Sequence, residues 1–278
     1  MQIAVASGKG GTGKTTISTS LALSCETDVQ YLDCDVEEPN GHIFLKPDLY
    51  HREVVSVTIP EVNEKKCTVC GKCRDICRYN AIVQFGDNVM TFPEMCHSCL
   101  GCFRVCEEDA LQYGRREVGV LESGKAGSIG FVHGRVRIGE AMGGPLLKAV
   151  KQKADPDKLN ILDAPPGTSC PFVESIVDAD YVILVTEPTP FGLHDLKLAV
   201  EVLQNLSIPG GIIINRADLG DKRVQEFCLE QEIPVLLEVP FQRNIAEGYA
   251  RGQNLIETVP ELREGLLNVL AQVVTQKV

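Results

Sequence analysis

The feature that most constrains the fold of this chain is the run Gly8-Lys9-Gly10-Gly11-Thr12-Gly13-Lys14-Thr15 near its start. It follows the apolar residues 3–6 and precedes a segment of helical character, residues 16–25. A buried strand, a glycine-rich loop and a helix N-terminus in this order predict a phosphate-binding loop, because loop N–H groups and the helix dipole converge on phosphate oxygens. In this pattern Lys14 neutralises the β- and γ-phosphates and the Thr15 hydroxyl holds Mg²⁺. The alternative is a glycine-rich turn without a ligand.

Acidic residues follow two other predicted strands. Residues 29–33 form a buried strand that ends at Asp33, with Asp35 two positions later, and residues 160–163 form another that ends at Asp163. Ligands bind at the carboxyl ends of strands in α/β sheets, so these carboxylates are expected beside the nucleotide. We expect Asp163 to order Mg²⁺ through water and Asp33 to lie near the metal. For Asp33 and Asp35 the alternative is a pair of solvated turn carboxylates.

Composition limits the class of protein. The chain has 278 residues, enough for one large domain or for one domain with a small insertion. Its net charge of −11 argues against general nucleic-acid binding, because contact with a phosphate backbone requires a basic surface. It has no run of about 18 apolar residues and starts directly with a strand, so we expect a cytoplasmic protein without a membrane or nucleic-acid partner. In a reducing compartment twelve cysteines favour metal binding over disulfides.

Eight of the twelve cysteines form two copies of one spacing. The two copies are Cys67-x2-Cys70-x2-Cys73-x3-Cys77 and Cys96-x2-Cys99-x2-Cys102-x3-Cys106. The repeat resembles the bacterial two-cluster ferredoxin motif, in which three cysteines of one copy and the last of the other hold each [4Fe–4S] cluster. The resemblance implies one cluster on Cys67, Cys70, Cys73 and Cys106. It implies a second cluster on Cys96, Cys99, Cys102 and Cys77.

Three further observations bear on the cysteine repeat. A strand-like segment follows each copy, residues 81–85 and 110–113, as in the ferredoxin fold. The proline that usually follows the fourth cysteine is replaced by Arg78 in one copy and by Glu107 in the other. This difference affects the expected reduction potentials but not the expected cysteine ligands. Tetrahedral zinc is the alternative to iron, although zinc modules usually space their pairs of ligands more widely.

The first loop, G-K-G-G-T-G-K-T, resembles the deviant Walker A motif of the MinD/ParA/Mrp and nitrogenase iron protein class. Residues 163–168, D-A-P-P-G-T, are similar to a second signature of that class. The resemblance implies Mg-ATP hydrolysis and an ATP-dependent homodimer, or heterodimer with a related ATPase. Within it Lys9, Lys14 and Asp35 are catalytic: Lys9 reaches the partner's nucleotide and Asp35 orients the attacking water. Alternatively, Lys9 adds positive charge beside its own phosphates. The expected nucleotide-binding residues of the loop are Gly8, Gly10, Gly11, Thr12, Gly13, Lys14, Thr15 and Thr16.

The same resemblance assigns the nucleotide base to Asn215, which follows the apolar residues 212–214, with Pro240 beside the ring. By itself an asparagine at a strand end is usually a turn residue. Cys170 lies seven residues after Asp163, the offset at which the nitrogenase iron protein class carries a cysteine for a shared cluster. No second partner cysteine accompanies it, so a small residue at a helix start is the preferred interpretation.

Alternating strand and helix segments predict an α/β fold, a doubly wound and mostly parallel sheet, with an inserted small α+β ferredoxin-like domain. We expect the ATPase domain in residues 1–50 and 117–278 and the insertion in residues 51–116. Residues 115–153 carry eight Lys or Arg against three acids, which either steers an anionic partner to one face or marks a solvated return to the sheet. The last helix, expected from residue 260 to about 276, has few basic residues, which argues against membrane targeting.

Three functions fit these motifs. In the first, a nucleotide-driven dimer rearrangement gates electron transfer from two clusters to a redox partner. In the second, the protein is an assembly factor that delivers clusters or metal to a client. In the third, it is a nucleotide-switched scaffold whose ferredoxin part docks a partner without catalysis. Two complete sets of ligands favour stable clusters and the first function, because a delivered cluster requires a labile, shared site.

Overall fold

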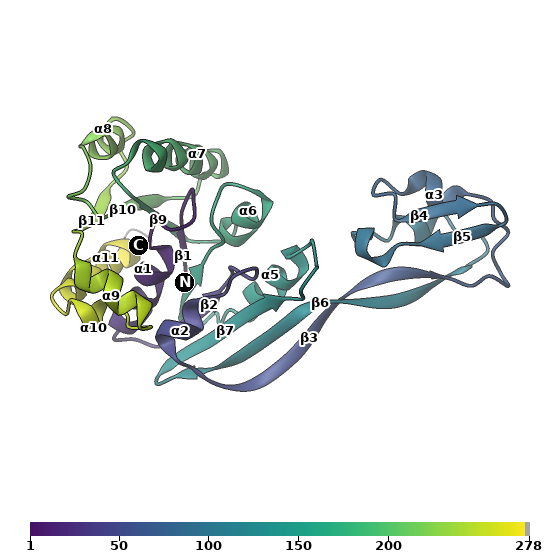
Figure 1. Cartoon of the computed structure of the whole chain (residues 1–278), viewed down its shortest axis with the longest axis horizontal. Helices are drawn as coiled ribbons and strands as arrows, with labels where there is room; N and C mark the ends of the chain where they lie inside the picture. The colour runs from purple at the N-terminus through teal and green to yellow at the C-terminus, as the bar shows by residue number, and fades with distance from the viewer. Residues whose placement is uncertain (276–278) are drawn as a thin grey trace.

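The computed structural model describes residues 1–275 and is built on a nine-stranded sheet (Figure 1). Its strand order is β11-β10-β9-β1-β8-β2-β7-β6-β3. Neighbouring strands from β11 to β7 are parallel, whereas β6 pairs with β7, and β3 with β6, in antiparallel fashion. The strands are β1 (Gln2–Ala6), β2 (Val29–Asp33), β3 (Asp48–Val62), β6 (Leu111–Ala126), β7 (Ile129–Val136), β8 (Leu159–Asp163), β9 (Tyr181–Thr186), β10 (Gly210–Asn215) and β11 (Val235–Val239).

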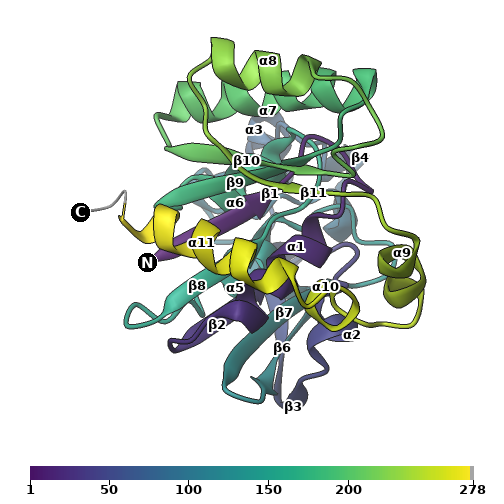
Figure 2. The same ribbon diagram turned by 90° about the vertical axis from the view of Figure 1, so that its left-hand side faces the viewer.

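Helices cover both faces of the parallel part of the sheet. Ala4 and Ala6 of β1 belong to one core cluster, and the alternate residues Ile3 and Val5 belong to the other. The first cluster includes residues of α5 to α8 and the second includes residues of α1, α10 and α11, so Figure 2 shows α7 and α11 on opposite sides of β9. The helices are α1 (Lys14–Ser24), α2 (Gly41–Leu45), α5 (Gly144–Lys151), α6 (Cys170–Ile176), α7 (Pro190–Leu206), α8 (Arg223–Glu230), α9 (Arg243–Ala250), α10 (Leu255–Thr258) and α11 (Leu262–Thr275). The predicted α/β fold with a mostly parallel sheet is therefore confirmed.

The last two strands at one side of the sheet, β6 and the edge strand β3, are much longer than the others. They have 15 and 16 residues and pair with each other from Asp48 to Val62 of β3. We call this pair the arm, and Figure 1 shows it extending away from the sheet with residues 63–110 at its far end. Residues 50 and 116, where we expect the domain boundaries, lie inside these strands, so the backbone has no break at either position.

Residues 63–110, which we call the cysteine lobe, contain short elements. These are α3 (Lys72–Ile76), β4 (Ile82–Phe85), β5 (Asn88–Thr91), the 3-10 helix η1 (Pro93–Met95) and α4 (Gly101–Arg104). β4 and β5 form an antiparallel hairpin. The first predicted strand after a cysteine repeat is therefore confirmed as β4, whereas the second is the start of the longer strand β6.

The C-terminal helix α11 runs from Leu262 to Thr275, and residue 276, where the sequence predicts its end, lies outside the described residues. Residues 115–153, for which the sequence allows either a basic face or a solvated return to the sheet, contain most of β6, all of β7 and all of α5. In the part of the chain that the structure describes, no helix combines the length and the apolar character needed to cross a membrane.

Candidate functional site

The carboxyl ends of β1, β2 and β10 surround a pocket of about 350 Å³. Asp35, Asn215 and Pro240 line its walls. Five other predicted residues, Gly8, Lys9, Thr12, Asp33 and Asp163, are not among the described residues that line it. The predicted loop residues that line it are Gly10, Gly11, Gly13, Lys14, Thr15 and Thr16. The structure therefore gathers residues from four separate parts of the chain around one cavity.

The loop between β1 and α1 has a backbone shape that depends on glycine. Gly11 and Gly13 have φ values of 82° and 91°, in the left-handed region. A Cβ atom on Gly13 would lie 2.4 Å from the side-chain nitrogen of Asn215. No side chain caps the start of α1, so its first N–H groups remain available to an anion. The hydroxyl of Thr12 is buried without a hydrogen-bond partner in the described structure, which fits a phosphate oxygen as its missing partner.

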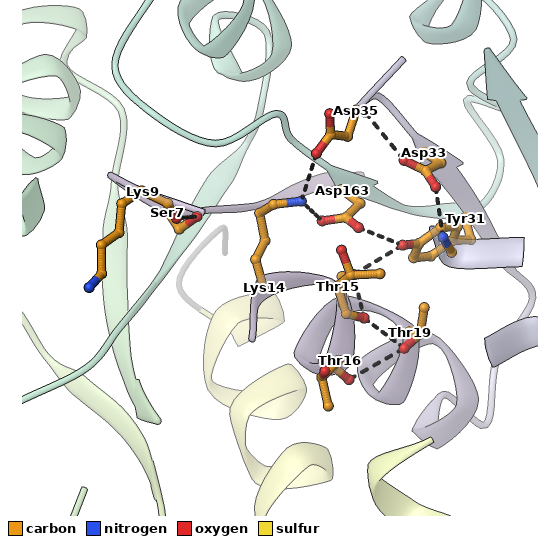
Figure 3. Close-up of polar contacts among 12 residues, drawn as sticks. Ser7, Lys9, Lys14, Thr15, Thr16, Thr19, Tyr31, Asp33, Asp35 and Asp163 are labelled. Carbon is orange, nitrogen blue, oxygen red and sulfur yellow. Dashed lines mark hydrogen bonds and ion pairs between the residues drawn. The ribbon is translucent and has the colours of Figure 1, made fainter. Parts of the chain in front are cut away.

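Lys14 reaches the acid at the end of β8 (Figure 3). Its Nζ lies 2.6 Å from Asp163 Oδ1 and 3.9 Å from Asp35 Oδ2. Burial alone would lower the pKa of Lys14, but the two carboxylates raise this pKa above its ordinary value. Lys14 therefore stays charged in the pocket, and it is the cation that nucleotide phosphates would meet.

Tyr31 is a site residue that the sequence analysis missed. Its hydroxyl donates a hydrogen bond of 2.9 Å to Asp163 Oδ2 (Figure 3). The same hydroxyl lies 3.1 Å from the hydroxyl of Ser18. Burial, and next the charge of Asp163, raise the pKa of Tyr31 well above its usual range, so it remains a donor. An aromatic residue within an apolar strand is usually an ordinary core residue. The feature that could have identified Tyr31 is its position two residues before Asp33 on the same strand.

Asp33 is fully buried, and backbone groups hold both of its carboxylate oxygens. Oδ2 accepts a hydrogen bond from the Gly41 N–H at 2.9 Å, and Oδ1 accepts one from the Asp35 N–H at 3.2 Å. Burial, and next the charge of Asp163, raise the pKa of Asp33 well above its usual value. These contacts position Asp35 and the start of α2, and a direct contact of Asp33 with Mg²⁺ stays a prediction.

Asp35 faces Lys14 across the pocket (Figure 3). Burial raises the pKa of Asp35 to about 6, an increase that the nearby Lys14 partly offsets. A carboxylate with this pKa is ionised at neutral pH and can orient an attacking water. Its role in orienting the attacking water stays a prediction that this geometry allows.

Lys9 extends away from Lys14 (Figure 3). Its Nζ lies 3.7 Å from Glu187 Oε2, and its side chain is 30% exposed. Glu187 also pairs with Arg216 at 2.5 Å. In this arrangement Lys9 is directed away from its own phosphate loop, and its action on a partner's nucleotide stays a prediction.

Asn215 connects the end of β10 to the phosphate loop. Its side-chain nitrogen donates a hydrogen bond of 2.8 Å to the carbonyl oxygen of Thr12. Pro240, Phe241 and Tyr249 line the pocket together with Asn215. Their rings give one wall an apolar surface suited to a nucleotide base. No sequence motif marks Tyr249, which comes from α9.

The cysteine lobe contains two small cavities, each of about 20 Å³. One cavity is lined by Cys67, Cys70, Cys73 and Cys106. The other is lined by Cys77, Cys96, Cys99 and Cys102. Each cavity therefore combines three cysteines of one repeat with the last cysteine of the other, and we call them the first and the second cavity.

The two halves of the lobe share backbone conformations at matching positions. Positive φ values recur at Val69 and Ser98, each two residues after the first cysteine of its repeat. They recur at Asn80 and Asp109, each three residues after the last cysteine. In each cavity one backbone N–H lies within 3.4 Å of a cysteine sulfur and donates a hydrogen bond to it. The sequence repeat is therefore also a structural repeat.

The cysteines surround cavities rather than converge on a point. Within residues 1–275, no three His, Cys, Asp or Glu side chains come close enough together to hold a single metal ion. Cys170 is exposed at the start of α6, outside the residues that line either cavity.

A parallel α/β sheet whose first strand leads into a glycine-rich loop, with acids at the ends of two adjacent strands, defines a P-loop nucleotide-binding protein. The CbiA family, described as the CobQ/CobB/MinD/ParA nucleotide binding domain, matches residues 3–256. The chain belongs to this family.

Curated relatives cover most of the chain. The uncharacterized protein MJ0578 of Methanocaldococcus jannaschii is 35% identical over 245 residues, 86% of each protein. The uncharacterized protein MJ0579 of the same organism is 28% identical over 262 residues, 92% of each. An iron-sulfur cluster carrier protein of Aquifex aeolicus is 24% identical over 305 residues, which cover 99% of this chain and 68% of that protein.

Solved structures share the fold. The septum site-determining protein MinD of Pyrococcus horikoshii, in complex with Mg-ADP, has a TM-score of 0.57 and 20% identity and covers 98% of this chain and 95% of that one. The cell division ATPase MinD of Pyrococcus furiosus also has a TM-score of 0.57, with 19% identity, and covers 100% of this chain and 99% of that one. Family membership and fold together identify the protein as an ATPase.

Proposed function

We propose that this ATPase couples Mg-ATP binding and hydrolysis to two [4Fe–4S] clusters in the cysteine lobe, and thereby gates electron transfer to a partner protein. The observation that carries the proposal is the partition of eight cysteines between two cavities, each with three cysteines of one repeat and the last of the other. We regard residues 51–116 as an inserted ferredoxin-like domain for the same reason. Such clusters require a reducing environment, in keeping with the expected cytoplasmic location.

The residues around the cavities fit an iron–sulfur group. Four thiols surround each cavity, and thiolates are the ligands such clusters prefer. Positive φ values in the loops turn backbone N–H groups toward the cysteine sulfurs, and hydrogen bonds of this kind tune reduction potentials. When bound, each cluster would supply a group that accepts and releases one electron.

In the nucleotide pocket, we propose the following roles for the chain's own residues. Lys14 leaves Asp163 to neutralise the phosphates, and the Thr15 hydroxyl holds Mg²⁺ while Asp163 orders it through water. Asp35 orients the water that attacks the γ-phosphate. Lys9 breaks its contact with Glu187 and reaches the nucleotide of a second copy, or of a related ATPase, in an ATP-dependent dimer.

Delivery of clusters or metal to a client is the second candidate function. The similarity to an iron-sulfur cluster carrier protein over 99% of this chain favours it. The complete sets of four cysteines favour retained clusters instead, because a delivered cluster requires open or shared ligands. We therefore place electron transfer first.

The deciding experiment is iron and acid-labile sulfide analysis of anaerobically purified protein, followed by EPR of the reduced protein with and without Mg-ATP. We expect about eight irons per chain and signals that change when Mg-ATP is added. Eight irons with signals indifferent to nucleotide would favour cluster delivery, tested next by transfer of labelled iron to an apo-ferredoxin. Two irons or fewer would refute the cluster proposal. Cys170→Ser is the matched control and should retain all the iron, since Cys170 lines neither cavity.

A further inference from the structure

Arg116 and Glu140 form a buried ion pair between the arm and the body of the protein. Arg116 lies on β6, and Glu140 lies between β7 and α5. Their side chains are 5% and 1% exposed, and Arg116 Nη1 donates a hydrogen bond to Glu140 Oε2. The other terminal nitrogen, Nη2, donates a hydrogen bond of 3.2 Å to the carbonyl oxygen of Cys96. One guanidinium therefore joins the body to a residue that lines the second cavity.

The position of Arg116 also brings its charge close to the Cys96 side chain. Burial lowers the pKa of Arg116, and the nearby Cys96 thiol group, when ionised, raises it. The Nε of Arg116 is buried and has no hydrogen-bond partner in the described structure. A buried cation beside a ligand sulfur favours whichever state of the bound group carries more negative charge.

The segment that carries Glu140 also packs against Val36, the residue next to Asp35 of the nucleotide pocket. At its start, the Val136 N–H donates a hydrogen bond of 3.0 Å to the carbonyl oxygen of Val36. At its end, a Cβ atom on Gly143 would lie only 3.0 Å from a methyl group of Val36, so the backbone is packed against that side chain. Val36 directly follows Asp35, which lines the pocket opposite Lys14.

These contacts form a continuous path from Lys14 and Asp35 to Cys96. Nucleotide binding must rearrange Lys14 and Asp35, because both carry charge inside the pocket. A shift of the adjacent Val36 would move the packed segment 136–143, and the buried ion pair would pass the movement to Arg116. Because the guanidinium is rigid and planar, a movement of Nη1 together with Glu140 also moves Nη2. The hydrogen bond from Nη2 to the carbonyl oxygen of Cys96 therefore changes.

Within residues 1–275, no ion pair connects the lining of the first cavity to the body of the protein. Lys72, which lines this cavity, pairs with Glu107, and Arg74, next to Cys73, pairs with Asp75. All four side chains are exposed and belong to the cysteine lobe itself. The two halves of the lobe are therefore alike in backbone but differ in their connection to the body.

We propose that the Arg116–Glu140 pair transmits the nucleotide state of the pocket to the second cavity and not to the first. Arg116 is a positioning residue in this proposal, and the nature of the bound group rests on the function proposed above. Coupling between two sites is reciprocal: if nucleotide changes the redox equilibrium of one cluster, the state of that cluster changes nucleotide affinity by the same factor. That reciprocity allows a test by binding alone.

The test uses cluster-loaded, anaerobic protein and measures the Kd for Mg-ADP in the oxidised and in the dithionite-reduced state. We expect the wild type to show a difference of about fivefold or more, the lower range of typical allosteric coupling. Arg116→Lys keeps the charge beside Glu140 but lacks the second arm of the fork, so it should bind ADP with the same Kd in both states. Arg74→Lys, the matched change beside the first cavity, should retain the wild-type difference.

Hydrogen–deuterium exchange of residues 93–104 supplies a second readout that does not depend on redox state. Exchange in this segment should respond to Mg-ADP in the wild type and in Arg74→Lys, but not in Arg116→Lys. Full iron content with an unchanged redox effect on Kd in Arg116→Lys would overturn the inference and leave the proposed function intact. A wild type with full iron and no redox effect on Kd would also overturn it. A wild type without iron would refute the proposed function instead.

Discussion

Lys14 and Asp163 form a buried ion pair, with Nζ 2.6 Å from Oδ1, in the pocket where nucleotide phosphates are expected. The pair connects the loop after β1 to the end of β8, two strands that are adjacent in the sheet. Phosphates that enter the pocket must therefore compete with Asp163 for the same ammonium group. Removal of either partner leaves an uncompensated charge inside the protein.

Lys14→Met should lower the affinity for Mg-ADP by roughly 10- to 100-fold, because a hydrogen bond to a charged group contributes about 1.5–3 kcal/mol. Isothermal titration calorimetry measures this loss. The variant should also unfold more easily by up to about 3–5 kcal/mol, since Asp163 loses its partner. Lys14→Met/Asp163→Asn should recover stability but not binding, and exposed Lys46→Met should behave like the wild type. Normal ADP binding by Lys14→Met would contradict the site.

The rate of ATP hydrolysis should rise with pH through about pH 6, because Asp35 has a pKa of about 6 and must be ionised to orient water. The profile of kcat/KM against pH measures this limb. Asp35→Asn should lose the limb and reduce the rate by about 10²–10⁴-fold. The folded-state pKa of Asp35 lies above its ordinary value, so its contribution to stability falls as the pH rises from about 3.8 to 6. Asp35→Asn should therefore raise the melting temperature at pH 7 but not at pH 3.

Lys9→Ala should bind Mg-ADP as the wild type does but should fail to dimerise with Mg-ATP, because Lys9 is directed away from its own phosphate loop. Sedimentation velocity with ADP and with a non-hydrolysable ATP analogue distinguishes the two states. Arg216→Ala removes the other partner of Glu187 and controls for the loss of that ion pair. ATP-induced dimers of Lys9→Ala would show that the lysine does not act across the interface.

Tyr31→Phe should destabilise the protein by about 1–3 kcal/mol, because an oxygen of Asp163 loses its buried donor. Chemical denaturation measures this loss. The same variant should hydrolyse ATP more slowly, since Asp163 is no longer held toward Lys14. Tyr50→Phe removes a hydroxyl from a side chain that is 71% exposed and should change neither property. Equal stability of Tyr31→Phe and the wild type would mean that the contact with Asp163 is energetically neutral.

Cys77→Ser should alter the same EPR signal as Cys99→Ser, although the two cysteines belong to different sequence repeats. The reason is that Cys77 and Cys99 line the second cavity. Cys70→Ser should alter the other signal, because Cys70 lines the first cavity. EPR of the three reduced variants, with iron quantified, distinguishes this crossed pattern. Signals that sort by repeat instead would refute the pattern.

The features that could be predicted from the sequence are those encoded over short stretches. The glycine loop before Lys14 and the alternation of strand and helix depend on local geometry. The local sequence alone was therefore sufficient to predict the P-loop fold. Tyr31 and Arg116 were not found because their partners are far away in sequence: Tyr31 meets Asp163 on β8, and Arg116 meets Glu140 beyond β7. Apolar or basic residues within a strand give no sign of such partners.

The long arm could not be predicted from the sequence for a similar reason. The extra residues of β3 and β6 pair only with each other, and their pattern does not reveal where the main sheet stops. The domain boundaries expected at residues 50 and 116 therefore fall within strands, where composition changes before the backbone does.

The paired strands of the arm make the reach of the cysteine lobe adjustable in fixed increments. Deletion of two residues from each strand, at positions that face each other, preserves pairing and keeps every side chain on its own face. Such a deletion would draw the lobe toward the sheet by about 7 Å. Deletion of one residue from each would instead reverse the faces and turn the lobe to the opposite side. The length of the paired strands therefore sets the distance between the cysteine lobe and the sheet in steps of two residues per strand. Related proteins with arms of other lengths would hold their cysteines at other distances from the sheet.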